Sequence, residues 1–383
     1  MNIIRRFFTV GSACALFASS FLAPESFAQD PNFYIFLAFG QSNMDGAGKI
    51  ENQDKTVNSR FKVMYAADND GSRKKGTWAT AVPPLCRGTS GLCPADYFGR
   101  TLVDSLPSNI KIGIINVAIP GTKIEVFVKN SYVNYLSKLS DKDKYIRDYA
   151  NNNYGGNPGG RLVEIGKIAQ KDGVIKGFLL HQGESNPNDE QWTSKVKSIY
   201  DNFISEFGLK ASETPLLAGE LLYTNKGGAC GAFNKYIKDL NKVIPNAHAI
   251  SADGLGGVDQ FHFTSDSYRK FGKRYADTML TILRNQGTGV AEGKSVKYGS
   301  GMESSLKMKV FANSVTFDLS ERSSVTLKAY SLQGSVISTI SSSELNAGEH
   351  SLTFNRETIP AGVFILELKA GKFVATKTIA SSK

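Results

Sequence analysis

Residues 33–44 read Phe-Tyr-Ile-Phe-Leu-Ala-Phe-Gly-Gln-Ser-Asn-Met, and this stretch decides the fold. An unbroken apolar run that ends at a glycine is typical of a strand buried on both faces of a parallel sheet. In such sheets ligands bind beyond the carboxyl ends of the strands. The turn at Gly40 therefore places Ser42 where a nucleophile would meet its substrate.

A serine hydroxyl is a weak nucleophile until a base takes its proton. The chain has four histidines, and His262 is the best candidate because it follows Asp259 by three residues in a predicted turn. Asp259 can accept a hydrogen bond from Nδ1 and leave Nε2 free to act on Ser42. His181 follows another apolar run, so it is predicted to form a wall of the same site.

Four motifs in chain order resemble those of the SGNH hydrolase superfamily. They are Gly40-Gln-Ser-Asn-Met44, Ala118-Ile-Pro-Gly-Thr-Lys-Ile124, His181-Gln-Gly-Glu-Ser185 and Asp259-Gln-Phe-His262-Phe-Thr264. More narrowly, they are similar to carbohydrate esterase family six, which contains acetylxylan esterases and their sialate O-acetylesterase-like relatives. The resemblance covers roughly residues 32–285. It implies a flavodoxin-like three-layer α/β/α fold and a serine esterase that uses no metal or other cofactor.

The resemblance also assigns roles to residues. Ser42 is similar to the nucleophile and His262 to the base, while the Ser42 amide, Gly121 and Gln182 resemble the oxyanion donors. Many relatives have glycine where this chain has Pro120. Proline has no N–H, so the donor of this loop is expected to be the Gly121 amide. Each aimed donor is worth on the order of 10²–10³ in rate.

Two carboxylates compete for the role of the acid that orients the base. Asp259 is the usual choice in the superfamily, and Glu184 of the His-Gln-Gly-Glu motif can assist or replace it. The alternative for Glu184 is a loop carboxylate paired with a nearby Lys or Arg. The residues alone leave this choice open.

Apolar runs alternate with amphipathic stretches along the chain, which predicts a parallel sheet covered on both faces. Strands are predicted at residues 33–39, 61–66, 110–118, 174–181, 215–222 and 247–251. Helices are predicted at residues 95–106, 161–170, 190–207, 232–243 and 265–283. Residues 129–160 are polar and rich in Tyr, Asn and Gly, so we interpret them as a long loop that lines the substrate crevice.

The ends of the chain have different characters. Residues 1–28 combine a basic start, an apolar stretch and Ser26-Phe-Ala28, which predicts a signal peptide and a secreted or cell-surface protein. No segment approaches the ~20 apolar residues of a membrane span. An esterase domain is therefore expected at residues 29–285, a Gly- and Ser-rich linker at 286–305, and a small β-sandwich at 306–383.

The C-terminal region resembles the sorting modules of type IX secretion, through Ile359-Pro-Ala-Gly-Val-Phe364. The alternative is a carbohydrate-binding module. Because the region has no tryptophan and few aromatic residues besides Tyr330, we favour sorting or attachment, with secretion machinery or the cell surface as the partner.

Cysteines and charge complete the expectations. Cys86 and Cys93 bracket a short loop that could close as a disulfide in an oxidising compartment. No spacing fits a metal site. The net charge of +10 favours acidic glycans as binding partners. The sequence contains no motif typical of nucleic-acid-binding proteins, so nucleic acid is not expected as a partner.

The sequence thus predicts a secreted carbohydrate O-acetylesterase, with acetylated xylan as its substrate. Sialate O-acetylesterase, lipase or thioesterase activity is the alternative among enzymes. A non-catalytic glycan-binding or adhesion protein is the alternative from another class, and the complete set of Ser42, His262 and Asp259 argues against it.

Overall fold

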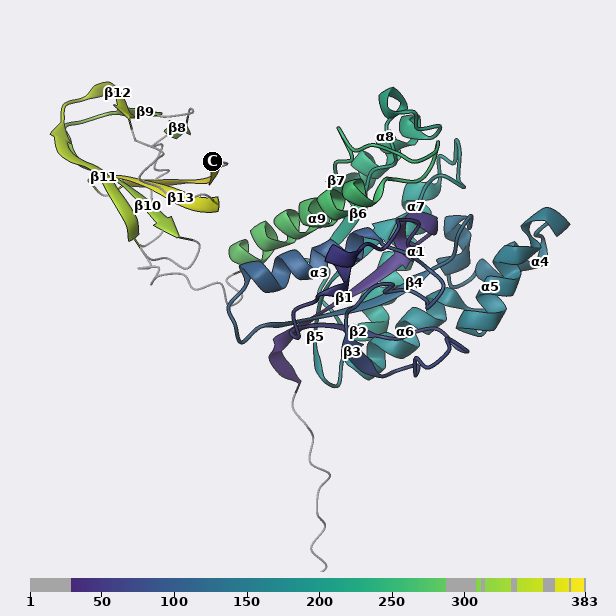
Figure 1. Cartoon of the computed structure of the whole chain (residues 1–383). Coiled ribbons are helices and arrows are strands. Elements are labelled where there is room, and N and C mark those ends of the chain that lie inside the picture. Colours follow the sequence, from purple (N-terminus) through teal and green to yellow (C-terminus); the bar gives the residue numbers. More distant parts are fainter. Residues whose placement is uncertain are drawn as a thin grey trace, which may run out of the picture.

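The computed structural model describes residues 29–286, 308–310, 314–331, 336–353, 362–371 and 373–381. The predicted signal peptide and all but the first residue of the predicted linker lie outside these residues. An α/β region precedes an antiparallel β region along the chain (Figure 1). Among the helices of the described ranges, none is both long enough and apolar enough to cross a membrane.

A seven-stranded sheet forms the centre of residues 29–286, with the strand order β3-β2-β4-β1-β5-β6-β7. Six strands run parallel, and β3 pairs antiparallel with β2 at one edge. The strands are β1 (Asp30–Gly40), β2 (Phe61–Met64), β3 (Trp78–Thr80), β4 (Lys111–Ala118), β5 (Gly173–His181), β6 (Leu216–Gly219) and β7 (Ala247–Ile250).

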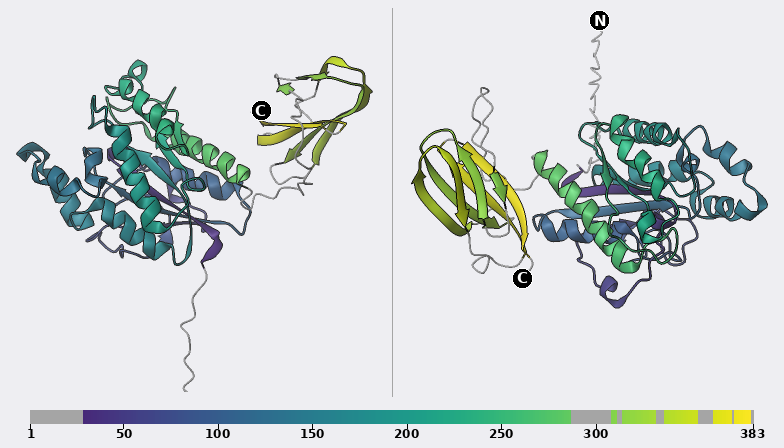
Figure 2. Two further views of the ribbon diagram at one scale, coloured as in Figure 1. Left: turned by 180° about the vertical axis from the view of Figure 1, so that it is seen from behind. Right: turned by 90° about the horizontal axis from the view of Figure 1, so that it is seen from above.

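Helices cover both faces of this sheet (Figures 1 and 2). Successive strand side chains point to opposite faces, so β1 buries Ile35 and Leu37 in one core and Phe36 and Ala38 in the other. Helices α6 and α7 pack into the first core, and α3 and α9 into the second. The α-helices are α1 (Ser42–Asp45), α2 (Asn52–Lys55), α3 (Pro94–Ser105), α4 (Tyr132–Ser137), α5 (Lys144–Tyr154), α6 (Pro158–Ala169), α7 (Trp192–Phe207), α8 (Asn234–Lys238) and α9 (Ser265–Asn285). The 3₁₀ helices are η1 (Ile124–Phe127), η2 (Asp141–Asp143), η3 (Thr224–Lys226), η4 (Gly231–Phe233) and η5 (Asp239–Lys242).

The predicted α/β architecture is confirmed, with differences in detail. Each predicted strand is present, and β3 was not predicted because three residues are too few to show a period. The helix predicted at residues 232–243 is divided into η4, α8 and η5.

The prediction of a long loop at residues 129–160 is wrong. This segment contains α4, η2 and α5. Although the segment is polar overall, the side chains of Leu136, Ile146 and Tyr154 are buried in the core. The helices are short and strongly polar on their outer faces, so their apolar residues are too widely spaced to stand out in the sequence.

The predicted disulfide between Cys86 and Cys93 is also wrong, since both are free thiols in the structure. Asn116 of β4 contacts both sulfur atoms: its main-chain oxygen lies 3.6 Å from Cys86 Sγ, and its Nδ2 lies 3.7 Å from Cys93 Sγ. Both thiols are buried, and burial raises the pKa of each one. The loop spacing allowed closure, but the packing around β4 gives each sulfur a different environment.

The described C-terminal strands form two antiparallel sheets, with the orders β11-β10-β13-β14 and β12-β9-β8. Side chains of β9, β10 and β13 share one core, which contains Phe317, Leu327 and Leu366. Residues 359–361 of the sorting-like motif lie outside the described residues. The strands are β8 (Met308–Val310), β9 (Ser314–Leu319), β10 (Ser323–Ser331), β11 (Val336–Leu345), β12 (Gly348–Thr353), β13 (Gly362–Ala370) and β14 (Phe373–Ser381).

Candidate active site

A close approach of two strand ends fixes the turn that carries Ser42. β1 and β5 are neighbours in the sheet, and the Gln41 N–H donates to the His181 carbonyl oxygen at 3.1 Å. A Cβ atom on Gly40 would lie 2.1 Å from that oxygen, so the approach requires glycine. The chain then enters α1, whose first residue is Ser42. The serine thus stands at the carboxyl edge of the sheet.

The loop between β7 and α9 brings His262 to Ser42. His262 Nε2 lies 2.9 Å from Ser42 Oγ, and its Nδ1 lies 2.8 Å from Asp259 Oδ2. The other carboxylate oxygen, Oδ1, accepts hydrogen bonds from the N–H groups of Phe261 and His262, each at 2.7 Å. Thr264 caps α9 directly after this loop. The structure therefore brings together three of the predicted site residues in a continuous chain of hydrogen bonds.

The ionisation of Asp259 fixes the tautomer of His262. Partial burial acts to raise the pKa of Asp259, but hydrogen bonds from His262 and Phe261 outweigh it and lower that pKa below its ordinary value. The ionised carboxylate can only accept a hydrogen bond, so His262 Nδ1 carries the hydrogen and Nε2 has a free lone pair. The Asp259 side chain is half exposed, so the site is open to water on this side.

Two main-chain amides near Ser42 are free to stabilise an oxyanion. Ser42 is the first residue of α1, where an N–H has no acceptor within the helix. The Gly121 N–H finds no acceptor among the described residues. Its loop is attached to the nucleophile turn, because the Ile119 N–H donates to the Gly40 carbonyl at 3.1 Å. Gly121 also has a positive φ of 70°, which glycine adopts readily.

Tyr145 of α5 lies against the Gly121 loop. A Cβ atom on Gly121 would meet the Tyr145 hydroxyl oxygen at 2.0 Å, so any larger residue at Gly121 would displace the tyrosine. Burial raises the pKa of Tyr145, which keeps the hydroxyl neutral. The segment interpreted as a crevice-lining insertion thus reaches the site through a helix instead of a loop.

Gln182 does not lie as the sequence predicted for an oxyanion donor. The two hydrogens of its side-chain Nε2 are shared among three acceptors, Gln41 Oε1 at 3.0 Å, Thr122 O at 3.2 Å and Asn186 Oδ1 at 2.7 Å. Its Oε1 accepts from Trp192 Nε1 at 2.6 Å. Every polar group of this buried amide is occupied, so the side chain connects the loops of the site instead of facing the substrate.

Glu184 contacts the loops around His262 but not His262 itself. Its Oε1 accepts a hydrogen bond from Asn43 Nδ2 at 2.6 Å, and the same Nδ2 donates to the Phe261 carbonyl at 3.0 Å. Neither Lys nor Arg pairs with Glu184 in the part of the chain that the structure describes. Burial raises the pKa of Glu184 to about 7.

His181 shares this buried environment. Its Nδ1 lies 3.8 Å from Glu184 Oε1, and neither His181 Nδ1 nor Glu184 Oε2 has a hydrogen-bond partner among the described residues. Burial lowers the pKa of His181 to about 4, so its ring is neutral near neutral pH. It packs edge to face on Phe263 and Phe271, which makes it part of the wall behind the site.

Glu184→Gln should remove a pH dependence of stability. A carboxyl whose pKa rises from its ordinary value of 4.5 to about 7 on folding stabilises the fold fully below about pH 4.5 and loses that contribution as pH rises through about 7. The neutral amide keeps an oxygen for Asn43 and does not titrate. As pH rises from 5 to 8, the unfolding temperature of the native protein should therefore fall by roughly 5 °C relative to that of the variant. Parallel curves at all pH values would contradict the buried, titrating carboxyl.

The sequence reasoning missed two asparagines that organise these loops. Asn43 follows the nucleophile directly, and Tyr268 of α9 donates to its Oδ1 while Nδ2 joins Glu184 to the His262 loop. Asn186 follows the His-Gln-Gly-Glu-Ser motif, and its Oδ1 accepts from the Ile124 N–H at 2.9 Å. Asn43 lies within the first of the four quoted motifs and Asn186 directly follows the third, and these positions were the available signal.

A buried ion pair behind Ser42 was also not predicted. Asp45, the last residue of α1, accepts hydrogen bonds from Arg87 Nη2 at 2.8 Å and 2.7 Å. The guanidinium stacks on the Tyr149 ring of α5, 4.4 Å from its centroid. Removing one partner of such a pair typically costs about 3–5 kcal/mol. The pair therefore ties the nucleophile helix to the segment that carries Tyr145.

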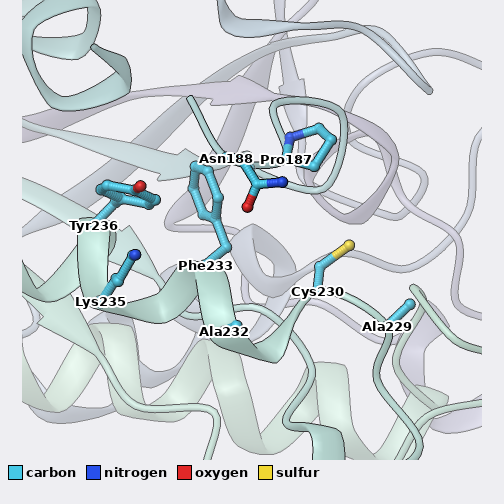
Figure 3. A pocket seen from close by; sticks show the side chains of 9 residues that line it. Pro187, Asn188, Ala229, Cys230, Ala232, Phe233, Lys235 and Tyr236 are labelled. Carbon is cyan, nitrogen blue, oxygen red and sulfur yellow. The ribbon is translucent and has the colours of Figure 1, made fainter. Parts of the chain in front are cut away.

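A pocket of about 230 Å³ lies beside these loops (Figure 3). One of its residues, Ala229, donates its N–H to the Gln260 carbonyl at 2.9 Å, next to Asp259. Another, Cys230, places Sγ 3.8 Å from the Glu184 carbonyl oxygen. The lining residues are Gly183, Pro187, Asn188, Ala229, Cys230, Ala232, Phe233, Lys235 and Tyr236. Within the described ranges, no group of three or more His, Cys, Asp or Glu residues is placed to hold a metal ion.

Similar structures are known from other proteins. A protein from Arabidopsis thaliana is 20% identical, with 66% of this chain and 99% of that chain covered and a TM-score of 0.49. A carbohydrate acetylesterase from Xanthomonas citri is 15% identical, with 87% and 74% covered and a TM-score of 0.46. The protein NanS is 15% identical, with 67% and 99% covered and a TM-score of 0.46.

A family model described as carbohydrate esterase, sialic acid-specific acetylesterase, matches residues 32–281. The narrower resemblance to carbohydrate esterase family six and the sorting role of the C-terminal strands stay predictions. The match is one continuous range that contains the Ser42 turn, the Gly121 loop and the His262 loop. Since that range is more than half of the chain, this protein belongs to the sialic acid-specific acetylesterase family of carbohydrate esterases.

Proposed function

We propose that the protein is a secreted serine O-acetylesterase that removes acetyl groups from glycans, with acetylated xylan as its main substrate. The observation that carries the catalytic part is the chain from Ser42 Oγ to His262 Nε2 at 2.9 Å and from His262 Nδ1 to Asp259 at 2.8 Å. A glycan-binding protein without activity would have no need for a serine and a base aligned in this way.

In the first half of the reaction, Ser42 Oγ attacks the acetyl carbonyl carbon while its proton moves to His262 Nε2. The carbonyl oxygen becomes an oxyanion, which accepts hydrogen bonds from the N–H groups of Ser42 and Gly121. Asp259 stabilises the imidazolium that forms. When the tetrahedral intermediate collapses, the bond to the sugar oxygen breaks and that oxygen takes the proton from Nε2.

In the second half, water attacks the acetyl group now bound to Ser42. The water gives one proton to His262 Nε2, and a second oxyanion forms in contact with the same two amides. Its collapse releases acetate and returns the proton to Ser42 Oγ. The half-exposed Asp259 side chain lies on the side from which water can reach the base.

The choice of glycan rests on likeness and not on the site itself. The similarity of the four motifs to acetylxylan esterases supports xylan. The description of the matching family supports O-acetylated sialic acid as the second candidate. The predicted signal peptide supports the secretion that we propose, and attachment or sorting by the C-terminal strands is part of the same proposal.

Activity should fall as the acyl chain of the substrate grows. An open acyl pocket would gain about 0.8 kcal/mol for each buried methylene, whereas a pocket closed around one methyl group imposes a steric penalty. We expect kcat/KM on p-nitrophenyl esters to fall at least about tenfold from acetate to butyrate and to be negligible with octanoate. A rate that rises with chain length would indicate a lipase-like or thioesterase-like enzyme with the same Ser42 and His262.

The glycan itself is tested by acetate release from a panel of acetylated xylan, acetylated mannan and O-acetylated sialic acid. The proposal expects xylan to give the highest kcat/KM. A clear preference for O-acetylated sialic acid would replace xylan by the second candidate. Turnover of p-nitrophenyl acetate without release from any glycan would reject the glycan part while leaving the esterase in place.

A further inference from the structure

Two exposed aromatic side chains lie beside the reacting groups. Among the side chains that the structure describes, Tyr145 and Phe261 are the exposed aromatic ones, with exposed fractions of 43% and 41%. The Tyr145 hydroxyl lies against Gly121, the second oxyanion donor, and Phe261 directly precedes His262. Single apolar side chains scattered over a surface are ordinary. Here, however, both exposed aromatic side chains border one site, which indicates a shared role.

The Phe261 ring is exposed although its backbone is held in place. Its N–H donates to Asp259 Oδ1 at 2.7 Å, and its carbonyl oxygen accepts a hydrogen bond from Asn43 Nδ2 at 3.0 Å. The centroids of the Phe261 and His262 rings are 6.4 Å apart, with 73° between the ring planes. The hydrogen bonds that place the base therefore also fix the backbone that carries this ring.

The Tyr145 ring is supported by a second set of contacts. It packs edge to face on Tyr149, with 6.4 Å between the ring centroids, and Tyr149 in turn contacts the Arg87 guanidinium that pairs with Asp45. Its hydroxyl is so close to Gly121 that a Cβ atom there would meet the oxygen at 2.0 Å. Among the described residues, this hydroxyl has no hydrogen-bond partner. It is therefore available to a polar group of the substrate.

The chemistry of the proposed reaction determines which part of the substrate these side chains meet. His262 Nε2 gives its proton to the oxygen of the leaving sugar, so this oxygen comes within about 3 Å of Nε2. The group bonded to it then lies beside the Phe261 ring. The carbonyl oxygen of the same ester lies at the Gly121 N–H, close to the Tyr145 hydroxyl. Both side chains are thus within reach of the group that carries the ester oxygen.

A pyranose ring suits these neighbours. It has a face of C–H groups that packs on an aromatic ring, and its hydroxyls can bind a phenol hydroxyl. If the acetyl group is on a ring carbon, the sugar ring begins one bond from the ester oxygen and meets both side chains. If the acetyl group is on an exocyclic chain, the ring is displaced by the length of that chain, which itself has no flat face.

We propose that Tyr145 and Phe261 bind the sugar ring that carries the acetyl group, so that the enzyme prefers acetyl groups on ring hydroxyls to those on exocyclic chains. Phe261 would pack on the C–H face of this ring, and the Tyr145 hydroxyl would bind one of its oxygens. The inference rests on the proposed glycan esterase function. It adds the place of the ester within the sugar and the two residues that select it.

The test compares two acetyl esters of one sugar. In methyl 3-O-acetyl-β-D-xylopyranoside the ester is on the ring, and in 2-acetoxyethyl β-D-xylopyranoside it is on a two-carbon chain. Acetate release gives kcat/KM for each. The ratio of the ring ester to the chain ester should be at least about ten in the native protein, since one aromatic contact and one hydrogen bond together contribute that much. p-Nitrophenyl acetate is a poor reference for this ratio, because its aromatic leaving group can itself pack on Phe261.

Phe261→Ala and Tyr145→Ala should each lower this ratio about three- to fivefold, and the double variant should bring it close to one. The ratio cancels any loss that comes from a displaced His262 loop, because the loop acts on both esters. If the alanine variants do not fold, Phe261→Leu and Tyr145→Leu provide the same test, since leucine keeps the apolar bulk without a flat ring. Tyr145→Phe, which removes only the hydroxyl, should lower the ratio less than Tyr145→Ala.

Ile168→Ala is the matched control and should keep the native ratio. Ile168 is also an exposed apolar side chain, but it lies near the end of α6, shortly before β5 begins, whereas Ser42 lies beyond the carboxyl end of β1. The same ratio in the double variant as in Ile168→Ala would overturn the role of the two aromatic side chains. A native ratio of one or less, or turnover of p-nitrophenyl acetate without either xyloside, would overturn the preference for ring esters. Absence of turnover on every acetyl ester would instead overturn the proposed function.

Discussion

Ser42→Ala is expected to lower the rate of acetate release by about 10⁶-fold, with the fold intact. The alanine keeps the backbone of the turn and removes the only atom that can form the acetyl-enzyme, and loss of the nucleophile in a serine hydrolase has an effect of this order. Ser42 Oγ contributes one hydrogen bond, to His262, so its removal leaves the buried contacts of the turn in place. The measurement is acetate release from p-nitrophenyl acetate and from acetylated xylan.

The control for this variant is its stability. Because Gly40, Gln41 and Asn43 keep their contacts, the unfolding temperature should stay within a few degrees of the native value. Ser185→Ala, which alters a hydroxyl bonded to the Gly121 carbonyl and not to the base, should retain far more activity. A folded Ser42→Ala protein with substantial turnover would reject Ser42 as the nucleophile.

Asp259→Asn is expected to lower kcat by roughly 10³-fold, up to the 10⁴ known for a buried triad aspartate. The asparagine Oδ1 can still accept from the N–H groups of Phe261 and His262, so the loop keeps its shape. The amide at the position of Oδ2, however, would donate to Nδ1 and place the ring hydrogen on Nε2, facing Ser42. We expect less than the full effect because the native carboxylate is half exposed and water can partly replace it.

Glu184→Gln is the matched comparison for Asp259→Asn, since both exchange a carboxylate for an amide near the base. Among the hydrogen bonds of the described residues, Glu184 is connected to the His262 loop through Asn43 and the Phe261 carbonyl, and it acts on His262 itself only as a charge at a distance. Its loss should therefore lower kcat far less than the loss of Asp259. A similar loss in the two variants would show that Glu184 shares the role of Asp259. Little loss in Asp259→Asn would assign that role to Glu184 alone.

The α/β region could be predicted from the sequence because its strands are buried on both faces. The unbroken apolar run of residues 33–39 leaves no other place for β1 than the centre of a parallel sheet, and the structure puts it between β4 and β5. The positions of Ser42 and His262 followed from the same logic, since each lies just beyond a strand or just before a helix. Asp259 followed from its place three residues before His262.

Features that depend on side-chain direction could not be predicted. The spacing of apolar residues in the sequence does not show whether the Gln182 side-chain amide faces the substrate or the protein interior. In the structure it forms hydrogen bonds with Trp192 and Asn186 in the interior. The environment of Cys86 and Cys93 depends on Asn116 of a distant strand, which no local spacing reveals. The same holds for Glu184, whose contact is the residue after the nucleophile.

The hydrogen bonds of Gln182 have a consequence for how the enzyme fails on heating. One buried amide joins Gln41 of the nucleophile turn, Thr122 of the oxyanion loop and Trp192 of α7. Releasing one of these partners leaves a buried polar group unsatisfied, at a cost of about 1–3 kcal/mol. The loops are therefore coupled and should loosen in one cooperative step instead of one after another. Esterase activity should therefore be lost at the same temperature at which the central sheet unfolds. We expect no intermediate temperature at which the protein is folded but its catalytic residues are misaligned.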